Sequence, residues 1–385
     1  MRILFCNYEY PPLGGGGGVI NALLAEELAK RHEVTVLTSK AHGQKSEVQE
    51  GKVHILRVPV WFRSRQATAN LPSMLAYILR APSVAGRYLD LQSYDVINTH
   101  FVLPSGPVGD RLARRYGIPN VLSLHGGDLF DPSKFTSPHR HFLLRMWVRR
   151  LVLRADAVVG QSTNTLSNLE RYYCRDVKPI RIPLGIRRPP FGQVERKRYG
   201  IEPDEIILVT VGRLVARKAI HQLLEIVRRL SDVPVRLLVI GEGPLLPDLR
   251  NRAHEYGITE KVSFLGRVDE TEKFGLLHRS DLFVSTSQHE GFGLVFLEAM
   301  ACGLPIICYD HGGQTDFLSD SVNGVIVSLN DLDAFVRHCR ELIERGEWRK
   351  RIEQVNLEEV EQYFIEHCAD QYERVFEATI DQYEG

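Results

Sequence analysis

"RILFCNYEYPPLGGGGGVINALLAEELAKR", residues 2–31, contains three segments of different character. Residues 2–8 form a short apolar run, residues 11–18 are rich in proline and glycine, and residues 19–31 repeat apolar side chains at helical spacing. This order predicts a buried strand, a tight loop and a helix. Residues 32–38, "HEVTVLT", then predict a second strand. Strand–helix alternation of this kind is typical of a parallel sheet with helices on both faces.

The same alternation continues along the chain and restarts once. Residues 182–205 are rich in proline, glycine and charge, which is typical of a linker. A chain of 385 residues is also long for a single core. We therefore expect an α/β architecture with two Rossmann-like domains, at 1–188 and 189–365, and a C-terminal helix, 366–385, that could pack on the first. Further strands are predicted from "YDVINTH", "IPNVLSLH" and "ADAVVGQS", and after the restart from "IILVTVGRL", "VRLLVIGEG", "VSFLGRV", "LFVSTS", "PIICYD" and "GVIVS".

Composition places the chain among ordinary globular proteins, with 44% hydrophobic and 25% charged residues. The apolar run at the start is too short for a signal peptide, and no uninterrupted apolar stretch reaches membrane-spanning length. The cysteines form no CxxC pair, so we interpret them as small buried hydrophobic residues in a reducing cytoplasm. They are Cys6, Cys174, Cys302, Cys308, Cys339 and Cys368. These features favour a cytoplasmic protein.

Charge is distributed unevenly, although the formal net charge is +0. Residues 1–190 hold 26 Lys and Arg against 14 Asp and Glu, and residues 191–385 hold 22 against 34. This asymmetry predicts that the first half faces an anionic partner. The acidic second half and the lack of a nucleic-acid-binding motif argue against nucleic acid as that partner.

Two stretches of the first half, 51–89 and 132–155, are basic and contain no acidic residue. The second stretch mixes its cations with large apolar residues in a helix-like pattern. One interpretation is a core helix whose arginines face solvent. The other is a peripheral, reversible contact with an anionic membrane, to which each nearby cation contributes about 1 kcal/mol. The cations are Lys52, Arg57, Arg63, Arg65, Arg80 and Arg87, then Lys134, Arg140, Arg145, Arg149, Arg150 and Arg154, and the apolar residues are Phe142, Leu143, Trp147 and Leu151.

Two segments at predicted strand ends suit phosphate groups. Glycines 14–18 follow the first strand, where backbone N–H groups can approach an anion, although a flexible turn is the alternative. No acidic residue ends the second strand, which disfavours NAD. Arg213 and Lys218 follow the first strand of the second half, and two cations at this position suit a diphosphate. A solvated loop is the alternative for these two cations.

Three further motifs are ambiguous on their own. His125 and Asp128 in "LHGGD" follow a buried strand, and their small neighbours leave room for a ligand. "GEGP", residues 241–244, is by default a tight turn. Asp331 and Asp333 resemble a metal-binding DxD motif, but we interpret them as the start of a capped helix and expect no metal site.

Glu290 and Glu298 lie eight positions apart in "HEGFGLVFLE", residues 289–298. A separation of seven would bring both side chains to one helical face, whereas eight leaves them apart. We therefore predict that Glu290 lies on a loop and Glu298 inside the helix that follows. This arrangement would direct two carboxylates at different parts of one ligand.

Taken together, these motifs resemble glycosyltransferase family 4, also called group 1. The resemblance implies a GT-B fold, in which two Rossmann-like domains with parallel sheets face each other across a cleft. It also implies retaining, metal-independent transfer of a hexose-type sugar without a cofactor, from a UDP- or GDP-sugar on the second domain to an acceptor on the first. A lipid-linked sugar, a phospholipid or another glycan of the cell envelope would suit the basic stretches, at the inner face of the membrane. The segments that carry the resemblance are "HEGFGLVFLEAMACGLPII" and, in the expected order, "VGRLVARK", "LVIGEGP", "VSFLGRV" and "GGQTDFL".

The resemblance also implies roles for individual residues. Arg213 and Lys218 would stabilise the nucleotide diphosphate as the sugar leaves. Glu290 would bind a hydroxyl of the donor sugar, Glu298 would bind the ribose hydroxyls, and His125 would lie beside the transferred sugar. We expect front-face attack by the acceptor with the leaving phosphate as base, rather than a Glu290 nucleophile. The remaining donor-binding positions are Gly15, Gly16, Gly241, Gly266, Arg267, Phe292, Gly293 and Leu294.

The chain departs from the family pattern at three positions. Leu184 and Arg187 replace the common Asn and Asp of the linker, and Asp316 replaces the usual Glu of the "GGQTD" segment. These differences can change the fit of the donor without removing the chemistry. A sugar-nucleotide epimerase of related fold and a non-catalytic nucleotide-sugar-binding protein are the alternatives.

Overall fold

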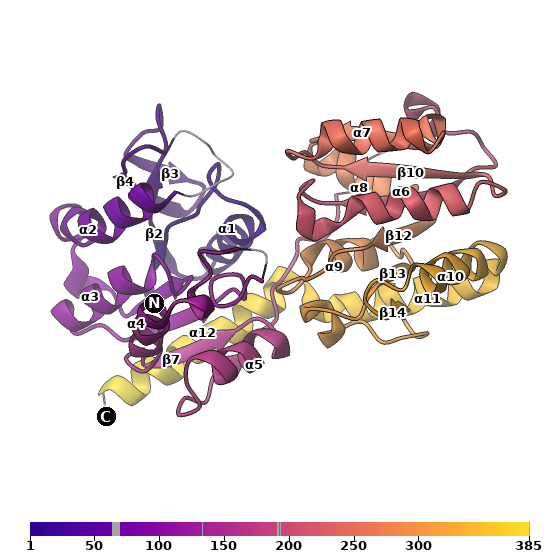
Figure 1. Cartoon of the computed structure of the whole chain (residues 1–385). Helices are drawn as coiled ribbons and strands as arrows, with labels where there is room; N and C mark the ends of the chain where they lie inside the picture. Colours follow the sequence, from indigo (N-terminus) through magenta and orange to yellow (C-terminus); the bar gives the residue numbers. More distant parts are fainter. Residues whose placement is uncertain (64–69, 133, 191, 193, 385) are drawn as a thin grey trace. The chain divides into compact units, whose positions relative to one another are not determined.

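The computed structural model divides into two compact units (Figure 1). Unit 1 comprises Met1–Arg187 together with Phe364–Gly385, and unit 2 comprises Arg188–Tyr363. Arg65, one of the basic residues noted in the sequence, lies outside the described residues. The structure describes residues 1–63, 70–132, 134–190, 192 and 194–384.

Unit 1 is built on a sheet with the strand order β3-β4-β2-β1-β5-β6-β7-β8. Neighbouring strands are parallel, except that β3 pairs antiparallel with β4 at one edge. Side chains of β1 alternate between two hydrophobic clusters, Ile3 and Phe5 in one and Leu4 in the other, because both faces of the sheet are covered. The strands are β1 (Arg2–Asn7), β2 (Glu33–Lys40), β3 (Glu47–Glu50), β4 (Val53–Pro59), β5 (Val96–His100), β6 (Asn120–Leu124), β7 (Ala157–Gly160) and β8 (Ile180–Arg181).

The helices of unit 1 lie on both faces of this sheet. One hydrophobic cluster joins α1 and α12 to the sheet, and the cluster on the other face contains side chains of α2 and α3. The C-terminal helix α12, yellow in Figure 1, packs against α1 although more than 300 residues separate them in the chain. The helices are α1 (Gly16–Leu28), α2 (Leu71–Tyr88), α3 (Gly106–Tyr116), α4 (Phe142–Val152), α5 (Thr163–Tyr172) and α12 (Ile365–Glu384).

Unit 2 contains a second parallel sheet, with the order β11-β10-β9-β12-β13-β14. Its apolar strands pack with α6, α7, α10 and α11 in one cluster, because each of these helices presents an apolar stripe to the sheet. The strands are β9 (Ile206–Val211), β10 (Val235–Ile240), β11 (Val262–Gly266), β12 (Leu282–Ser285), β13 (Ile306–Tyr309) and β14 (Gly324–Val327). The helices are α6 (Ile220–Arg229), α7 (Leu246–Glu255), α8 (Glu270–His278), α9 (Leu294–Ala301), α10 (Leu332–Glu344) and α11 (Gly346–Glu359).

The segment between β2 and β5 is where the sequence pattern predicted least. It forms β3, β4 and α2, none of which was predicted from periodicity. The start of α10 was predicted correctly: Asp331 Oδ1 accepts the backbone N–H of Ala334 at 2.9 Å, and Asp333 forms an ion pair with Arg229 at 2.6 Å. The interpretation of these two aspartates as the start of a capped helix is therefore confirmed.

The six cysteines are free thiols, and all except Cys302 are buried. Burial raises the pKa of the Cys6 thiol to about 12, so this side chain remains a neutral thiol near pH 7. The cysteines thus behave as the small hydrophobic residues that their spacing predicted.

Candidate functional site

In unit 2 the strand order changes direction between β9 and β12. From β9 the chain moves outward through β10 and β11, whereas β12 begins a series that moves the other way. Loops that leave the carboxyl ends of two such strands diverge, and open α/β sheets bind ligands in the crevice between them. Arg217 and Lys218 follow β9, and Glu290 follows β12. The topology therefore brings these three charged residues to one switch point.

Glu290 forms the centre of a buried ion cluster at this point. Lys218 Nζ donates to Glu290 Oε1, and Arg217 Nη1 lies 3.1 Å from Glu290 Oε2. Glu290 is only 7% exposed. Burial alone would raise the pKa of the carboxyl, but Lys218 and Arg217 outweigh burial and hold the pKa at about 2. The cluster thus carries two cations around one permanently ionised carboxylate, which leaves one excess positive charge.

Glycines allow the loops around this cluster to touch one another. A Cβ atom on Gly312 would lie 2.5 Å from the carbonyl oxygen of Glu290, and one on Gly313 would overlap the backbone at Gly291. Likewise, a Cβ on Gly241 would overlap the backbone of Gly212. Any side chain at these positions would push the loops apart, so the glycines set how closely backbone groups surround the ion cluster.

Helix α9 begins beside Glu290 in the chain and has no side-chain cap. Its N-cap is Gly293, which has a φ of 97° and therefore a conformation that favours glycine. The uncapped N–H groups and the helix dipole at this end favour an anion. Phe292 is buried directly before the helix and Leu294 is its first residue. The backbone at 292–294, predicted to support the donor, is thus the start of α9.

Glu298 lies inside α9, and Glu290 lies in the loop after β12. The predicted placement of one carboxylate on a loop and one in a helix is therefore confirmed. Glu298 accepts a hydrogen bond from Lys273 Nζ at 2.8 Å, and Lys273 also contacts Glu270 at 3.0 Å. Burial raises the pKa of Glu298, although Lys273 acts against burial.

The predicted residues of unit 1 centre on His125, which follows β6. His125 Nε2 lies 3.0 Å from Nδ1 of His100, at the end of β5, and Nε2 of His100 lies 2.8 Å from the side-chain nitrogen of Asn98. Because the Asn98 amide nitrogen donates, His100 Nε2 accepts and His100 Nδ1 donates to His125. The neutral His125 ring then carries its proton on Nδ1, which is buried and has no hydrogen-bond partner.

This hydrogen-bond chain extends to the C-terminal helix. Ser123 Oγ donates to Asn98 Oδ1 at 3.1 Å, and the Tyr372 hydroxyl on α12 donates to Ser123 Oγ at 3.1 Å. Burial lowers the pKa of His125 to about 3, so the ring is neutral near pH 7. His125 is therefore held as a neutral ring with one unused N–H donor.

Asp128 and the glycine loop have largely structural contacts. Asp128 accepts backbone N–H groups from Val102 at 2.7 Å and from His125 at 3.0 Å, and burial raises its pKa to about 6. Within the glycine run, a Cβ on Gly17 would meet the ring of Phe101 at 2.5 Å. Part of the run is thus a close-packed turn, rather than the flexible turn that was the alternative to a phosphate site. Gly15, by contrast, is the N-cap of α1 with open space at its Cβ position, and Gly16 begins the helix.

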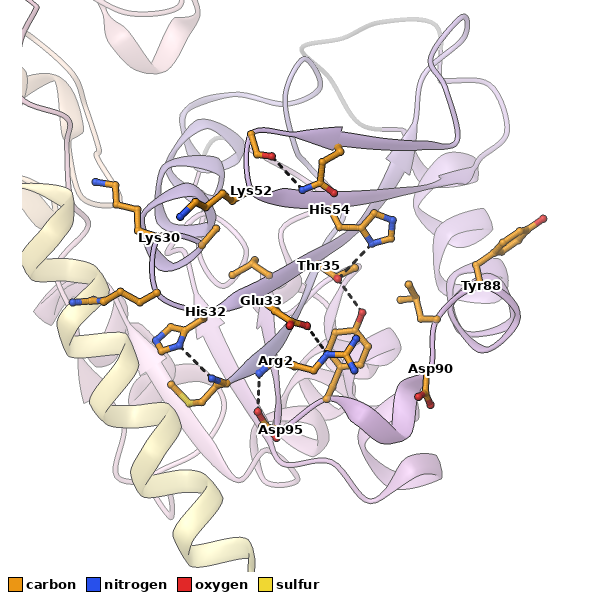
Figure 2. Close-up of a pocket in the computed structure, with 18 residues that line it drawn as sticks. Arg2, Lys30, His32, Glu33, Thr35, Lys52, His54, Tyr88, Asp90 and Asp95 are labelled. Atoms are coloured by element: carbon orange, nitrogen blue, oxygen red, sulfur yellow. Dashed lines mark hydrogen bonds and ion pairs between the residues drawn. The ribbon is translucent and has the colours of Figure 1, made fainter.

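Unit 1 also contains an open cavity of about 1020 Å³ at the amino ends of β1 and β2, opposite the edge that carries His125 (Figure 2). Arg2 is paired with two acidic residues of its lining. Arg2 forms an ion pair with Glu33 at 2.8 Å, and the backbone N–H of Arg2 donates to Asp95 at 2.6 Å. Figure 2 shows these contacts across the cavity wall. None of the predicted site residues lines this cavity.

Comparison with known families shows which family the chain belongs to. Residues 193–357 match the family model described as glycosyl transferases group 1, and residues 15–185 match the glycosyl transferase 4-like domain. The chain belongs to the group 1 glycosyltransferases. This glycosyltransferase is 25% identical to N-acetyl-alpha-D-glucosaminyl L-malate synthase of Bacillus anthracis, over 95% of this chain and 94% of that protein. The resemblance drawn from the motifs is confirmed, and the protein is an enzyme of the transferase class.

Solved structures agree on the fold of this glycosyltransferase. Sucrose-phosphate synthase from Thermosynechococcus elongatus has a TM-score of 0.86 at 22% identity, covering 99% of this chain and 100% of that one. HepE of Anabaena, in complex with UDP-glucose, has a TM-score of 0.76 at 18% identity, covering 98% of this chain and 100% of that one. The expected GT-B class, with two parallel-sheet α/β domains, is confirmed.

In this glycosyltransferase, only one of the two cations predicted to hold the diphosphate lies in the ion cluster with Glu290. Arg213 is exposed, and its side chain makes no hydrogen bond or ion pair within the part of the chain that the structure describes. Arg217, which the sequence argument did not single out, contacts Glu290 instead. Its signal was its position directly before Lys218. Gly266 ends β11 and accepts the N–H of Gly241 at 2.7 Å, and Arg267 follows it, exposed.

Proposed function

We propose that this glycosyltransferase transfers a hexose-type sugar from a UDP- or GDP-sugar, with retention of configuration and without a metal ion. The observation that carries the proposal is the buried cluster of Glu290, Lys218 and Arg217 at the switch point of the unit 2 sheet. Its excess positive charge, together with the uncapped start of α9, would receive the diphosphate. The UDP-glucose bound in the solved HepE structure supports a nucleotide sugar as donor.

The proposed reaction breaks the bond between the anomeric carbon and the diphosphate oxygen. The acceptor hydroxyl forms the new bond on the same face, and its proton passes to an oxygen of the leaving phosphate. Lys218 and Arg213 stabilise the charge that moves onto the diphosphate. Glu290 is poorly suited to be a nucleophile, because two cations occupy its oxygens, and it binds a sugar hydroxyl while it positions Lys218.

Unit 1 is proposed to receive the acceptor, with His125 Nδ1–H as a donor toward the sugar. We propose a lipid-linked sugar or a phospholipid of cell-envelope glycan synthesis as acceptor, and a reversible contact with the inner face of the membrane. Support comes from the basic residues of unit 1 and from the exposed apolar side chains of α4. Among the described residues, no helix is both long and apolar enough to pass through a bilayer.

The experiment that tests this proposal measures release of UDP or GDP from each candidate nucleotide sugar, with and without an acceptor fraction and with EDTA present. Transfer predicts that the nucleotide is released only with acceptor and that EDTA does not prevent it. An epimerase would change the sugar without releasing nucleotide, and a binding protein would do neither. A loss of activity in EDTA that magnesium or manganese restores would contradict metal independence.

A further inference from the structure

Arg63 is a buried cation that has no anionic partner among the described residues. It lies four residues beyond the end of β4 and is 5% exposed. Its guanidinium stacks on the ring of Tyr8 at 4.3 Å, and Nη1 donates to Ser39 Oγ at 2.9 Å. Its Nε and Nη2 groups are buried and have no hydrogen-bond partner in the part of the chain that the structure describes. Burial raises the pKa of the Tyr8 hydroxyl, and Ser73 and Arg63 act against burial, so the Arg63 charge acts on this ring.

The other buried arginine of the same basic stretch shows the contrast. Arg57 is also 5% exposed, and it is paired with Glu50 at 2.8 Å. Arg63 has no carboxylate within 4.0 Å among the described residues. Residues 51–89, which surround Arg63 in the chain, contain no acidic residue at all. The acidic residue that follows Tyr8, Glu9, turns its side chain toward Gly14.

Burying a charge without a partner is costly, by several kcal/mol even after the protein relaxes. An apolar side chain of equal length would pack on Tyr8 without this cost. The guanidinium offers two free N–H donors in the fork geometry that matches a phosphate or a carboxylate. A ligand anion would therefore gain a desolvated, preorganised cation. Phe62, the residue before Arg63, is 81% exposed.

The position of Arg63 fits a ligand site. Tyr8 follows β1, Ser39 lies near the end of β2 and Arg63 follows β4, so all three stand at the carboxyl edge of the unit 1 sheet. This is the edge that carries His125 at the end of β6. Asn7, the last residue of β1, adds a further buried and unpaired amide nitrogen at the same edge.

We infer that Arg63, with Tyr8 and Ser39, forms a subsite for an anionic group, a phosphate or a carboxylate, on the acceptor. The assignment of this anion to the acceptor rests on the proposed function, whereas the anion site itself does not. The group can belong to a soluble molecule or to a lipid headgroup, and the chemistry at Arg63 is the same.

The test compares Arg63→Met with Arg87→Met, an exposed arginine of the same stretch. Both are made in a Lys218→Ala background, so that the cation cluster of unit 2 contributes less to anion binding. Thermal unfolding is followed with inorganic phosphate or succinate, against sodium chloride at equal ionic strength. We expect saturable stabilisation that Arg63→Met abolishes and Arg87→Met retains. Without ligand, Arg63→Met unfolds at the same or a higher temperature, because it removes an unpaired buried charge.

Two further measurements identify the source of the anion and keep the inference testable if Arg63→Met does not fold. Cosedimentation with phosphatidylcholine vesicles, with and without phosphatidic acid, shows whether Arg63 also recognises a lipid headgroup. If Arg63→Met fails to fold, the side-chain Nε–H resonance of Arg63, assigned by its loss in Arg63→Lys, is expected to shift on adding phosphate to the otherwise unmodified protein. Equal responses of the Arg63→Met and Arg87→Met variants, or no response to any of the probes, would overturn the inference.

The same protein, without the Lys218 change, is tested for stabilisation by UDP and GDP. Nucleotide binding without an Arg63-dependent anion effect would reject the subsite and leave the proposed function standing. An Arg63-dependent effect without nucleotide binding would support the subsite and reject the proposed function.

Discussion

At the scale of single residues, the buried charges of the candidate site are held in ion pairs. Glu290 is compensated twice, by Lys218 and Arg217, and Glu298 is compensated by Lys273. Removing one member of a buried pair leaves the other charge unpaired, at a cost of about 3–5 kcal/mol. The charges at the site therefore contribute to folding, besides the binding role that we propose for them.

Lys218 and Arg213 separate these two contributions. Both Lys218→Ala and Arg213→Ala are expected to lower turnover by about tenfold or more, because each removes a cation that is proposed to face the leaving diphosphate. The sequence alone suggests a solvent-lined position for both, but Lys218 is mostly buried and paired, so only its replacement should also lower the unfolding temperature. Arg228→Ala on the surface of α6 is the control. Unchanged activity in both variants would reject the site.

The two glutamates are distinguished by different measurements. Glu298→Ala is expected to weaken binding of free UDP or GDP, since Glu298 is assigned to the ribose. Glu290→Ala should leave nucleotide binding nearly unchanged and reduce transfer strongly, since Glu290 is assigned to the sugar and to positioning Lys218. Calorimetric titration and steady-state kinetics measure the two effects. An exchange of these two behaviours would contradict the assignments.

His125 and His100 should make the protein acid-sensitive. Burial lowers both pKa values, that of His125 to about 3, below the ordinary value of about 6.5. The unfolded chain therefore binds protons first, and stability present above pH 6.5 is lost as the pH falls toward 3, by up to about 1.4 kcal/mol per pH unit for each ring. Asp128, with its pKa raised to about 6, acts in the opposite direction between pH 6 and 4.

The difference between variant and native curves isolates the histidine contribution. In urea unfolding followed from pH 8 to pH 4, His125→Gln should make the free energy of unfolding fall less steeply below pH 6.5 than it does in the native protein. Parallel curves for the two proteins would show that His125 is not held neutral by the fold.

At the scale of single elements, α4 combines features of both interpretations that its sequence allowed. Val148 and Leu151 are buried, so Leu151 belongs to the core rather than to a surface face. Phe142 is 65% and Leu143 79% exposed, and the start of the helix therefore presents apolar side chains to solvent. Arginines 145, 149 and 150 lie on the same helix. This combination of exposed apolar and cationic residues favours a membrane surface.

We expect the protein to cosediment with vesicles that contain anionic lipid at low salt and to be released at high salt. Arg145, Arg149 and Arg150 changed together to Glu should abolish binding, and Phe142→Ser with Leu143→Ser should weaken it at constant charge. Leu75→Ser with Leu79→Ser, on the exposed face of α2, is the matched control. Failure to bind anionic vesicles at low salt would favour a soluble acceptor.

At the scale of the whole molecule, unit 2 is formed by one continuous segment of the chain and unit 1 by two separate segments. Unit 2 is one uninterrupted segment, whereas unit 1 needs α12 from the end of the chain. Tyr372 and Phe376 of α12 are nearly inaccessible and lie in the core of unit 1. Each such side chain contributes about 1.5–3 kcal/mol by burial, so loss of the helix approaches the total stability of a domain, about 5–15 kcal/mol.

Residues 188–363 expressed alone are therefore expected to fold and to bind UDP or GDP, as measured by circular dichroism and thermal shift. A chain that ends at residue 363 should retain a cooperative transition for unit 2 only. An intact transition for unit 1 in this shortened chain would show that α12 is dispensable.

The two-sheet architecture, the strand–helix alternation outside the segment between β2 and β5, and the loop-and-helix placement of Glu290 and Glu298 could be predicted from the sequence. These features depend on local periodicity and on motifs that are continuous in the chain. The partners of buried charges could not. Lys218 and Glu290 are 72 positions apart and meet only because β9 and β12 are neighbours in the sheet. Tertiary packing likewise decides that Arg217 rather than Arg213 joins them, that Leu151 is buried, and that Arg57 is paired with an anion while Arg63 has none among the described residues. Local sequence sets what each element is, and the packing of strand ends decides which charges meet.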